Sequence, residues 1–211
     1  MYNVPYFKEK DSKVLIQFMR EHSFAMLIGS KENMPVATQV PFLIEEREGK
    51  VYLQAHIMRN TDHHKALVSN PNALCIFTGA HAYISASSYI NPQAVSTWNY
   101  MSVHVKGKVT FLDDAALLLL LEKTTSHYEQ DENSPAAFGK LEKEYVEKLM
   151  KAIVGLEIDA EQMDHVFKLS QNRDERSYSN IVNKLKEGDA DALRIAEEME
   201  KRKLSIFKQA K

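Results

Sequence analysis

The chain has 211 residues, a formal net charge of −2, and 44% hydrophobic and 27% charged residues, the balance of an ordinary globular protein. This length allows one large domain, or one domain with a small helical appendage. Because the net charge is close to zero, the chain lacks the overall positive charge that attracts proteins to nucleic acid without regard to sequence.

Cysteine usage and hydropathy predict a cytoplasmic protein. Cys75 is the only cysteine, so an intramolecular disulfide is impossible and a reducing compartment is expected. The first ten residues contain no apolar signal segment. The longest purely apolar run, 115–121, is far shorter than the roughly 20 residues that cross a bilayer, so no membrane partner is expected.

The first half of the chain reads as a helix followed by short strands. Helical spacing of apolar residues, β-prone runs and turn residues distinguish the two kinds of element. They predict, in order, a helix over 11–21, strands over 24–28, 36–44 and 51–57, a helix from 61 or 62 to 68, a strand over 73–78, and a turn-rich stretch over 79–98.

The second half begins with the clearest strand pattern in the chain. Over 100–111, apolar and polar residues alternate, which is typical of a strand with one buried face. The same criteria then predict a helix from Asp113, a polar loop over 129–135, a helix over 141–150, strands over 153–158 and 165–169, and helices from 173 onward with a break at Gly188-Asp189.

This order of elements predicts the fold class. Strands follow one another without the regular β-α alternation that a parallel sheet needs. We therefore expect a mainly β, α+β fold: an antiparallel, closed or partly closed barrel with peripheral helices. Residues 1–172 are predicted to form the barrel domain and residues 173–211 a C-terminal helical extension.

A candidate anion site lies where the strand over 51–57 leads into the next helix. Arg59 and Asn60 precede the predicted helix start, and Lys65 follows one turn later. Backbone N–H groups at a helix N-terminus suit a phosphate, Arg can bind it through two donors, and Lys adds a point charge. The alternative is a solvated loop followed by a surface helix.

Histidines gather in the same region without a metal-binding pattern. Five of the eight histidines, His56, His63, His64, His81 and His104, fall within fifty residues. His63 and His64 are adjacent and therefore diverge on a helix, which does not match the i, i+4 spacing of a metal pair. We predict no metal site and favour ordinary hydrogen-bonding roles, with haem ligation as an alternative.

A candidate ring-binding position lies at the start of the clearest strand. Trp98, the only tryptophan, stands beside Asn99. An aromatic side chain can cover a planar ligand while an amide binds its edge. The alternative is that Trp98 closes one end of the barrel.

Five blocks, in the same order over nearly the whole chain, resemble the PaiB family. They are Met1 to Phe7, His56 to Asn60, Phe77 to Ser85, Ser96 to Tyr100 with Val103-His104, and Lys168 to Asn172. The resemblance implies a split β-barrel that binds flavin mononucleotide (FMN) as a homodimer. It also implies a negative transcriptional regulator of sporulation and of degradative, protease-producing genes.

The resemblance also assigns positions around the cofactor. Gln39, Val40 and Pro41 match the strand that passes the flavin ring. The stretch that holds the phosphate matches Gln54 to Asn60, which includes His56 and Arg59, together with Lys65. Trp98 and Asn99 match the partner-strand residues that reach the cofactor.

The chain departs from the usual family pattern at four positions, Thr61, Ala80, Ala86 and Ser88. At Thr61 a proline is lost, which enlarges the local ensemble, and at Ser88 an aromatic residue is lost. These departures predict weaker flavin binding.

Three functions remain open at this point. The first is a flavin-binding regulator; the second is a flavin-dependent oxidoreductase or haem-degrading enzyme with indirect regulatory effects. DNA is the partner in the third, but no helix-turn-helix pattern is evident and only the tail over 201–211 is net basic. We therefore expect no direct reading of bases.

Overall fold

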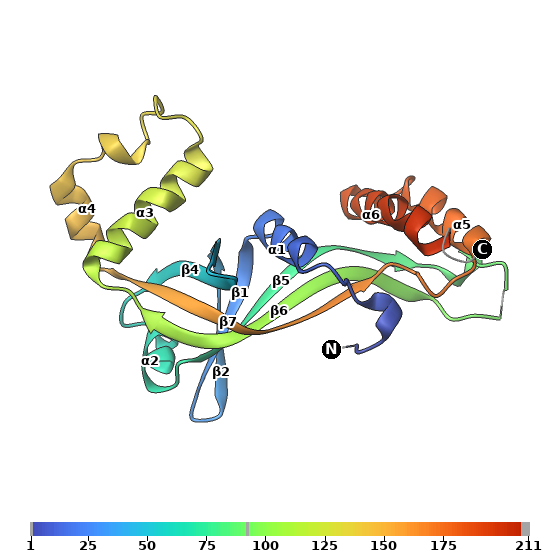
Figure 1. Ribbon diagram of the computed structural model, residues 1–211, viewed down its shortest axis with the longest axis horizontal. Helices are drawn as coiled ribbons and strands as arrows, with labels where there is room; N and C mark the ends of the chain where they lie inside the picture. The colour runs from blue at the N-terminus through green and yellow to red at the C-terminus, as the bar shows by residue number, and fades with distance from the viewer. Residues whose placement is uncertain (1, 92, 208–211) are drawn as a thin grey trace. The chain divides into compact units, whose positions relative to one another are not determined.

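The structure is a computed structural model that describes residues 2–91 and 93–207 (Figure 1). Its strands are β1 (Phe24–Lys31), β2 (Met34–Pro41), β3 (Leu43–Arg47), β4 (Lys50–Met58), β5 (Asn72–Ile84), β6 (Thr97–Phe111) and β7 (Ile153–Lys168). Its helices are η1 (Pro5–Phe7), α1 (Ser12–Glu21), α2 (Asp62–Ser69), η2 (Ala86–Ser88), α3 (Asp114–Glu129), η3 (Phe138–Lys140), α4 (Lys143–Met150), α5 (Glu175–Leu185) and α6 (Ala190–Phe207).

The strands form one antiparallel sheet in the order β2-β1-β5-β6-β7-β4-β3. The first pair is a hairpin whose turn uses Glu32 and Asn33 at positive φ, as tight hairpin turns require. The predicted antiparallel fold with peripheral helices is confirmed. The sheet is open, and β2 and β3 are its edge strands.

The chain divides into two compact units. Unit 1 is drawn from residues 1–18, 78–103 and 164–211, and unit 2 from residues 19–77 and 104–163. The strands β5, β6 and β7 each contribute one end to each unit. The prediction of a domain boundary between residues 172 and 173 stays a prediction.

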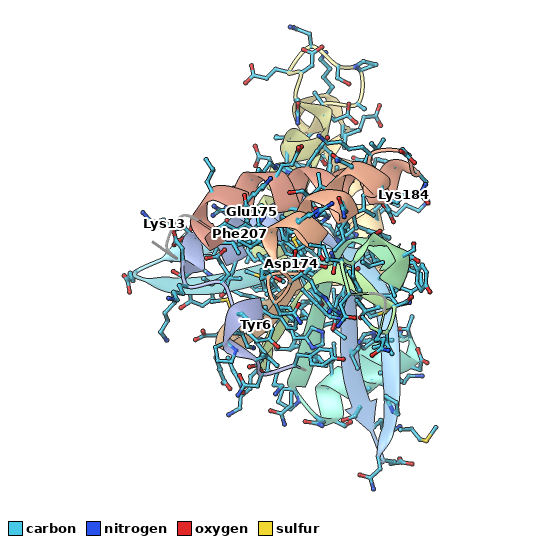
Figure 2. All side chains as sticks on the ribbon, turned by 90° about the vertical axis from the view of Figure 1, so that its right-hand side faces the viewer. Tyr6, Lys13, Asp174, Glu175, Lys184 and Phe207 are labelled. Carbon is cyan, nitrogen blue, oxygen red and sulfur yellow. The ribbon has the colours of Figure 1, made fainter. Side chains whose placement is uncertain are left out.

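In unit 1, α5 and α6 pack against each other. Figure 2 labels Asp174 and Glu175 at the start of α5 and Phe207 at the end of α6. The buried Tyr178 hydroxyl donates to the Met199 carbonyl at 2.8 Å, and its ring meets the Phe207 ring edge-on at a centroid distance of 5.2 Å. The two helices are separated where the sequence predicts a break, at Gly188-Asp189.

In unit 2, α3 carries the apolar run found in the sequence. The Asp113 side chain accepts a hydrogen bond from the Ala116 amide at 2.8 Å, which caps the helix where the sequence predicts its start. Leu117 and Leu120 are buried, whereas Leu118 and Leu119 are exposed. Across the described ranges, no helix combines the length and apolar character needed to cross a lipid bilayer.

Three predicted strand boundaries are wrong. The run 36–44 is two strands, because the chain leaves β2 at Pro41 and starts β3 at Leu43. The strand β5 extends through 79–84, which was predicted as turns; buried positions shift there from odd to even residue numbers. The runs 153–158 and 165–169 belong to one strand, β7, whose polar middle had suggested a break.

A close approach of β6 and β7 in unit 2 generates a test of the sheet. A Cβ atom added at Gly107 would lie 1.9 Å from the Asp159 carbonyl oxygen, whereas one added at Gly139 would have no heavy atom within 4 Å. We expect Gly107→Ala to lower the free energy of unfolding by about 1–3 kcal/mol or more, because backbone must move. Gly139→Ala is the matched control and should be close to neutral in the same urea titration. Equal stability of the two variants would contradict the close approach of Gly107 to the Asp159 backbone.

Candidate functional site

The turn between β4 and α2 is fixed by a short network of hydrogen bonds. Asn60 has a φ of 65°, a left-handed conformation that reverses the chain after the strand. Its amide donates to His64 Nδ1 at 3.1 Å. Thr61 caps the helix: its Oγ1 accepts from the His64 amide at 3.2 Å and donates to the Met58 carbonyl at 3.1 Å.

Backbone amides at the start of α2, which the sequence analysis considered as donors to an anion, are used within this network. The His63 amide donates to Asp62 Oδ1 at 2.8 Å, and the Lys65 amide donates to the Thr61 carbonyl at 3.1 Å. The His64 amide is also engaged, so the backbone amides of these three residues are not free for an anion. An anion at this turn therefore depends on side chains.

Arg59 is held in place by Ala152 and by Ile153, the first residue of β7. Its amide donates to the Ala152 carbonyl, and its Nη2 donates to the Ile153 carbonyl, both at 2.8 Å. The side chain is exposed, and this is its one hydrogen bond within the described residues. The remaining guanidinium donors are therefore free for a ligand.

Arg59 and Lys65 act on the same imidazole. Burial lowers the pKa of His64 first, and the positive charges of Arg59 and Lys65 lower it further. Because His64 Nδ1 accepts a hydrogen bond, the neutral ring carries its proton on Nε2 and can donate there. The turn thus joins two cations and one neutral donor.

The two cations line different cavities. Arg59 lies at a cavity of about 880 Å³ beside α3 and α4, and Lys65 lies at one of about 390 Å³ together with Lys31 and Met34. The structure brings Arg59 and Lys65 to one turn but not into one pocket.

The other predicted residues of unit 2 lie on strands β2 and β4. On the edge strand β2, Gln39 is exposed, Val40 is buried and Pro41 is half-buried. His56 is half-buried on β4 opposite Gly155 of β7, and burial lowers its pKa.

His63, for which the sequence analysis favoured an ordinary hydrogen-bonding role, is another polar residue of this region. It is buried, its Nδ1 lies 2.8 Å from Thr38 Oγ1, and its Nε2 has no hydrogen-bond partner among the described residues. A Cβ added at Gly29 would lie 3.4 Å from this Nε2. Burial lowers the pKa of His63, because an imidazolium in this place would lose its hydration. In the sequence, the only feature that could have indicated this burial of His63 is its position in the helix α2.

Trp98 and Asn99 lie in unit 1 and point to different environments. Trp98 is half exposed and contacts the His81 and Tyr83 rings at centroid distances of 5.8 and 5.7 Å. Asn99 is completely buried: its Oδ1 accepts from Ser170 Oγ at 3.1 Å. Trp98 therefore presents an aromatic surface to solvent, whereas the Asn99 amide is used inside the unit.

The polar cluster after β7 is structural within unit 1. The Gln171 side chain accepts from the Leu169 amide and donates to the Phe167 carbonyl, and the Lys168 ammonium binds Thr97 Oγ1. Across residues 2–91 and 93–207, no group of three histidine, cysteine or acidic side chains is arranged to hold a metal ion.

The lowered histidine pKa values predict how stability depends on pH. Because burial lowers the pKa of His63 below its ordinary value of 6.5, the folded chain holds less of a proton there than the unfolded chain as the pH falls through this range. The free energy of unfolding should therefore fall as the pH drops from 7.5 to 5.5. Urea titrations at several pH values should show a smaller fall for His63→Gln. Since His56, His64 and His165 share this direction, only part of the slope should disappear. An unchanged slope in the variant would contradict the assignment.

Comparisons with known proteins agree with the fold and identify the family. The family described as "Putative FMN-binding domain" matches residues 1–162. The "Protease synthase and sporulation protein PAI 2" of Bacillus subtilis is 32% identical over 201 residues, covering 95% of this chain and 97% of that protein.

Two solved structures share the fold at low sequence identity. The FAD and heme binding protein of Mycobacterium smegmatis superposes with a TM-score of 0.57 at 16% identity, over 76% of this chain and 72% of that one. The flavocytochrome Anf3 of Azotobacter vinelandii has a TM-score of 0.56 at 13% identity, over 80% and 72%. On the family match and the Bacillus relative, the chain belongs to the FMN-binding PaiB family.

Proposed function

We propose that the protein is a cytoplasmic, homodimeric FMN-binding regulator that restrains sporulation and degradative-protease genes through its flavin. The observation that carries the proposal is the placement of Arg59, His64 and Lys65 within one turn of chain, between the end of β4 and the first residues of α2, in a member of an FMN-binding family. Beyond the effect of burial, the positive charges of both cations lower the pKa of His64. The family match indicates that the cofactor is FMN. The side chains at the turn are proposed to bind the phosphate of this cofactor.

The donor set at the turn fits a phosphate monoester. Arg59 offers unused guanidinium donors, Lys65 an ammonium and His64 an Nε2–H. Charge-assisted bonds from such donors are the strongest that a phosphate receives. His56 and the strand segment Gln39 to Pro41 are proposed to face the flavin itself, which supplies redox chemistry when bound.

Trp98 is proposed as a separate ring contact. The group of Trp98, Tyr83 and His81 offers exposed aromatic surface in unit 1, and flat aromatic ligands stack on such surfaces. The buried Asn99 is proposed to fix the strand that carries Trp98, since its own amide faces inward.

The homodimer is proposed because the phosphate donors of one chain line separate cavities. The edge strand β2 is exposed along most of its length, with Met34 and Gln39 open to solvent. An exposed edge is a ready partner for a second chain. We infer that a second copy completes the enclosure of the cofactor.

Regulation through the flavin is favoured over direct reading of DNA. Four basic side chains on or next to α5 and α6 are paired with acidic ones: Lys184 with Glu187, Lys186 with Glu200, and Lys201 and Arg202 with Glu198. Paired cations contribute little to binding of DNA phosphates.

Titration of FMN against the purified chain, followed by flavin fluorescence, tests the proposal. Saturable quenching is expected, and Arg59→Ala and Lys65→Ala should each weaken binding by roughly tenfold, the value of one charge-assisted hydrogen bond. Lys108→Ala, on an exposed position of β6, is the matched control and should bind like the natural chain. Trp98→Leu tests the aromatic contact on its own. Absence of saturable quenching would overturn the proposal.

The same complex separates the regulator from the enzyme. A regulator should keep its flavin absorbance in the presence of NADH, whereas an oxidoreductase should show NADH-dependent bleaching. If the protein instead retarded promoter DNA in a gel in a sequence-specific and salt-dependent way, direct recognition of DNA would be favoured.

A further inference from the structure

The segment between β6 and β7 borders a pocket that has no role in the proposed flavin binding apart from Arg59. The helices α3 and α4 lie side by side at the ends of these strands (Figure 1). Together with η3 they border the cavity of about 880 Å³ described above, a size typical of sites for small organic ligands. We call it the insertion pocket; it is lined by Arg59, Asp114, Ala115, Leu118, Phe138, Gly139, Leu141, Lys143, Val146, Glu147, Met150 and Lys151.

The walls of the insertion pocket are largely apolar. Leu118 comes from α3, Phe138 from η3, and Val146 and Met150 from α4. Leu118 and Leu141 remain 40% and 38% exposed. Covering this apolar surface would be favourable, at about 25 cal/mol for each Å² removed from water.

Packing of unit 2 does not account for the exposed leucines of α3. Leu117 and Leu120 are almost completely buried, and Leu117 would lie 3.1 Å from a Cβ added at Gly155 of β7. These two residues attach α3 to the unit. Leu118 instead lines the pocket, while Leu119 is exposed and does not line it.

The charges around the pocket favour an anionic head group. Lys143 is paired with Glu147 at 3.7 Å, which leaves Arg59 and Lys151 against Asp114. Arg59 is the better ligand of the two cations, because its bond to the Ile153 carbonyl already fixes the guanidinium. A carboxylate can take two parallel hydrogen bonds from such a group.

We propose that the insertion pocket binds an aliphatic carboxylate. The hydrocarbon tail of this ligand would lie between α3 and α4, and its carboxylate would bind Arg59. This site is distinct from the proposed flavin site, although Arg59 belongs to both. Its existence does not depend on flavin binding.

Calorimetric titration of the flavin-free full chain with decanoate tests this proposal. Saturable binding is expected, and Leu118→Gln should weaken it by roughly tenfold through loss of a buried leucine contact. The matched control, Leu119→Gln, changes a neighbouring exposed leucine outside the pocket and should bind like the natural chain. No saturable heat, or equal losses in both variants, would overturn the proposal.

Two further arms test the head group and the competing occupant. Decanol should bind more weakly than decanoate, and Arg59→Gln should remove this preference; equal binding of the two ligands by the natural chain would overturn the anionic assignment. A loss of the dimer in Leu118→Gln by light scattering would show that a second copy fills the pocket instead. FMN titration of Leu118→Gln separates the two sites, because unchanged flavin affinity leaves the proposed function intact whatever decanoate does.

Discussion

Placement of two positive charges beside a neutral imidazole is the constraint on which the functional account depends. The β4–α2 turn holds them there because Asn60 takes a left-handed conformation and Thr61 caps the helix. The Ala152 and Ile153 carbonyls fix Arg59 at one side. Besides burial, the positive charges of Arg59 and Lys65 disfavour the protonated form of His64, and an anion bound beside them would offset that effect.

Local signals in the sequence were sufficient to predict several helix ends, including the one beside the candidate site. The cap at Asp113, the break at Gly188-Asp189 and the start of α2 follow from residue types at helix ends. Arg59 and Lys65 could be selected as candidate anion ligands because of their positions relative to that start, and this role stays a prediction. Pairing between distant segments could not be predicted: the polar middle of β7 is a strand because neighbouring strands accept its hydrogen bonds. For the same reason, the hydrogen bond from Ser170 to the buried Asn99 side chain could not be predicted.

Arg59 links the two proposed sites. Its backbone belongs to the turn, while its guanidinium borders the insertion pocket. A carboxylate drawn to this guanidinium would withdraw it from a phosphate at the turn, so the two ligands would oppose each other's binding. Such coupling would let a metabolite set flavin occupancy without contacting DNA. That arrangement suits a protein in which four basic side chains on or next to α5 and α6 are already paired with acidic ones.

The pKa of His64, followed by NMR in the absence and presence of FMN, tests the central claim most directly. A phosphate held by Arg59 and Lys65 would add negative charge beside the imidazole and favour its protonated form. The account therefore predicts that saturating FMN raises the pKa of His64, with the resonance identified by its loss in His64→Gln. An unchanged or lower pKa at full flavin occupancy would show that the phosphate binds elsewhere.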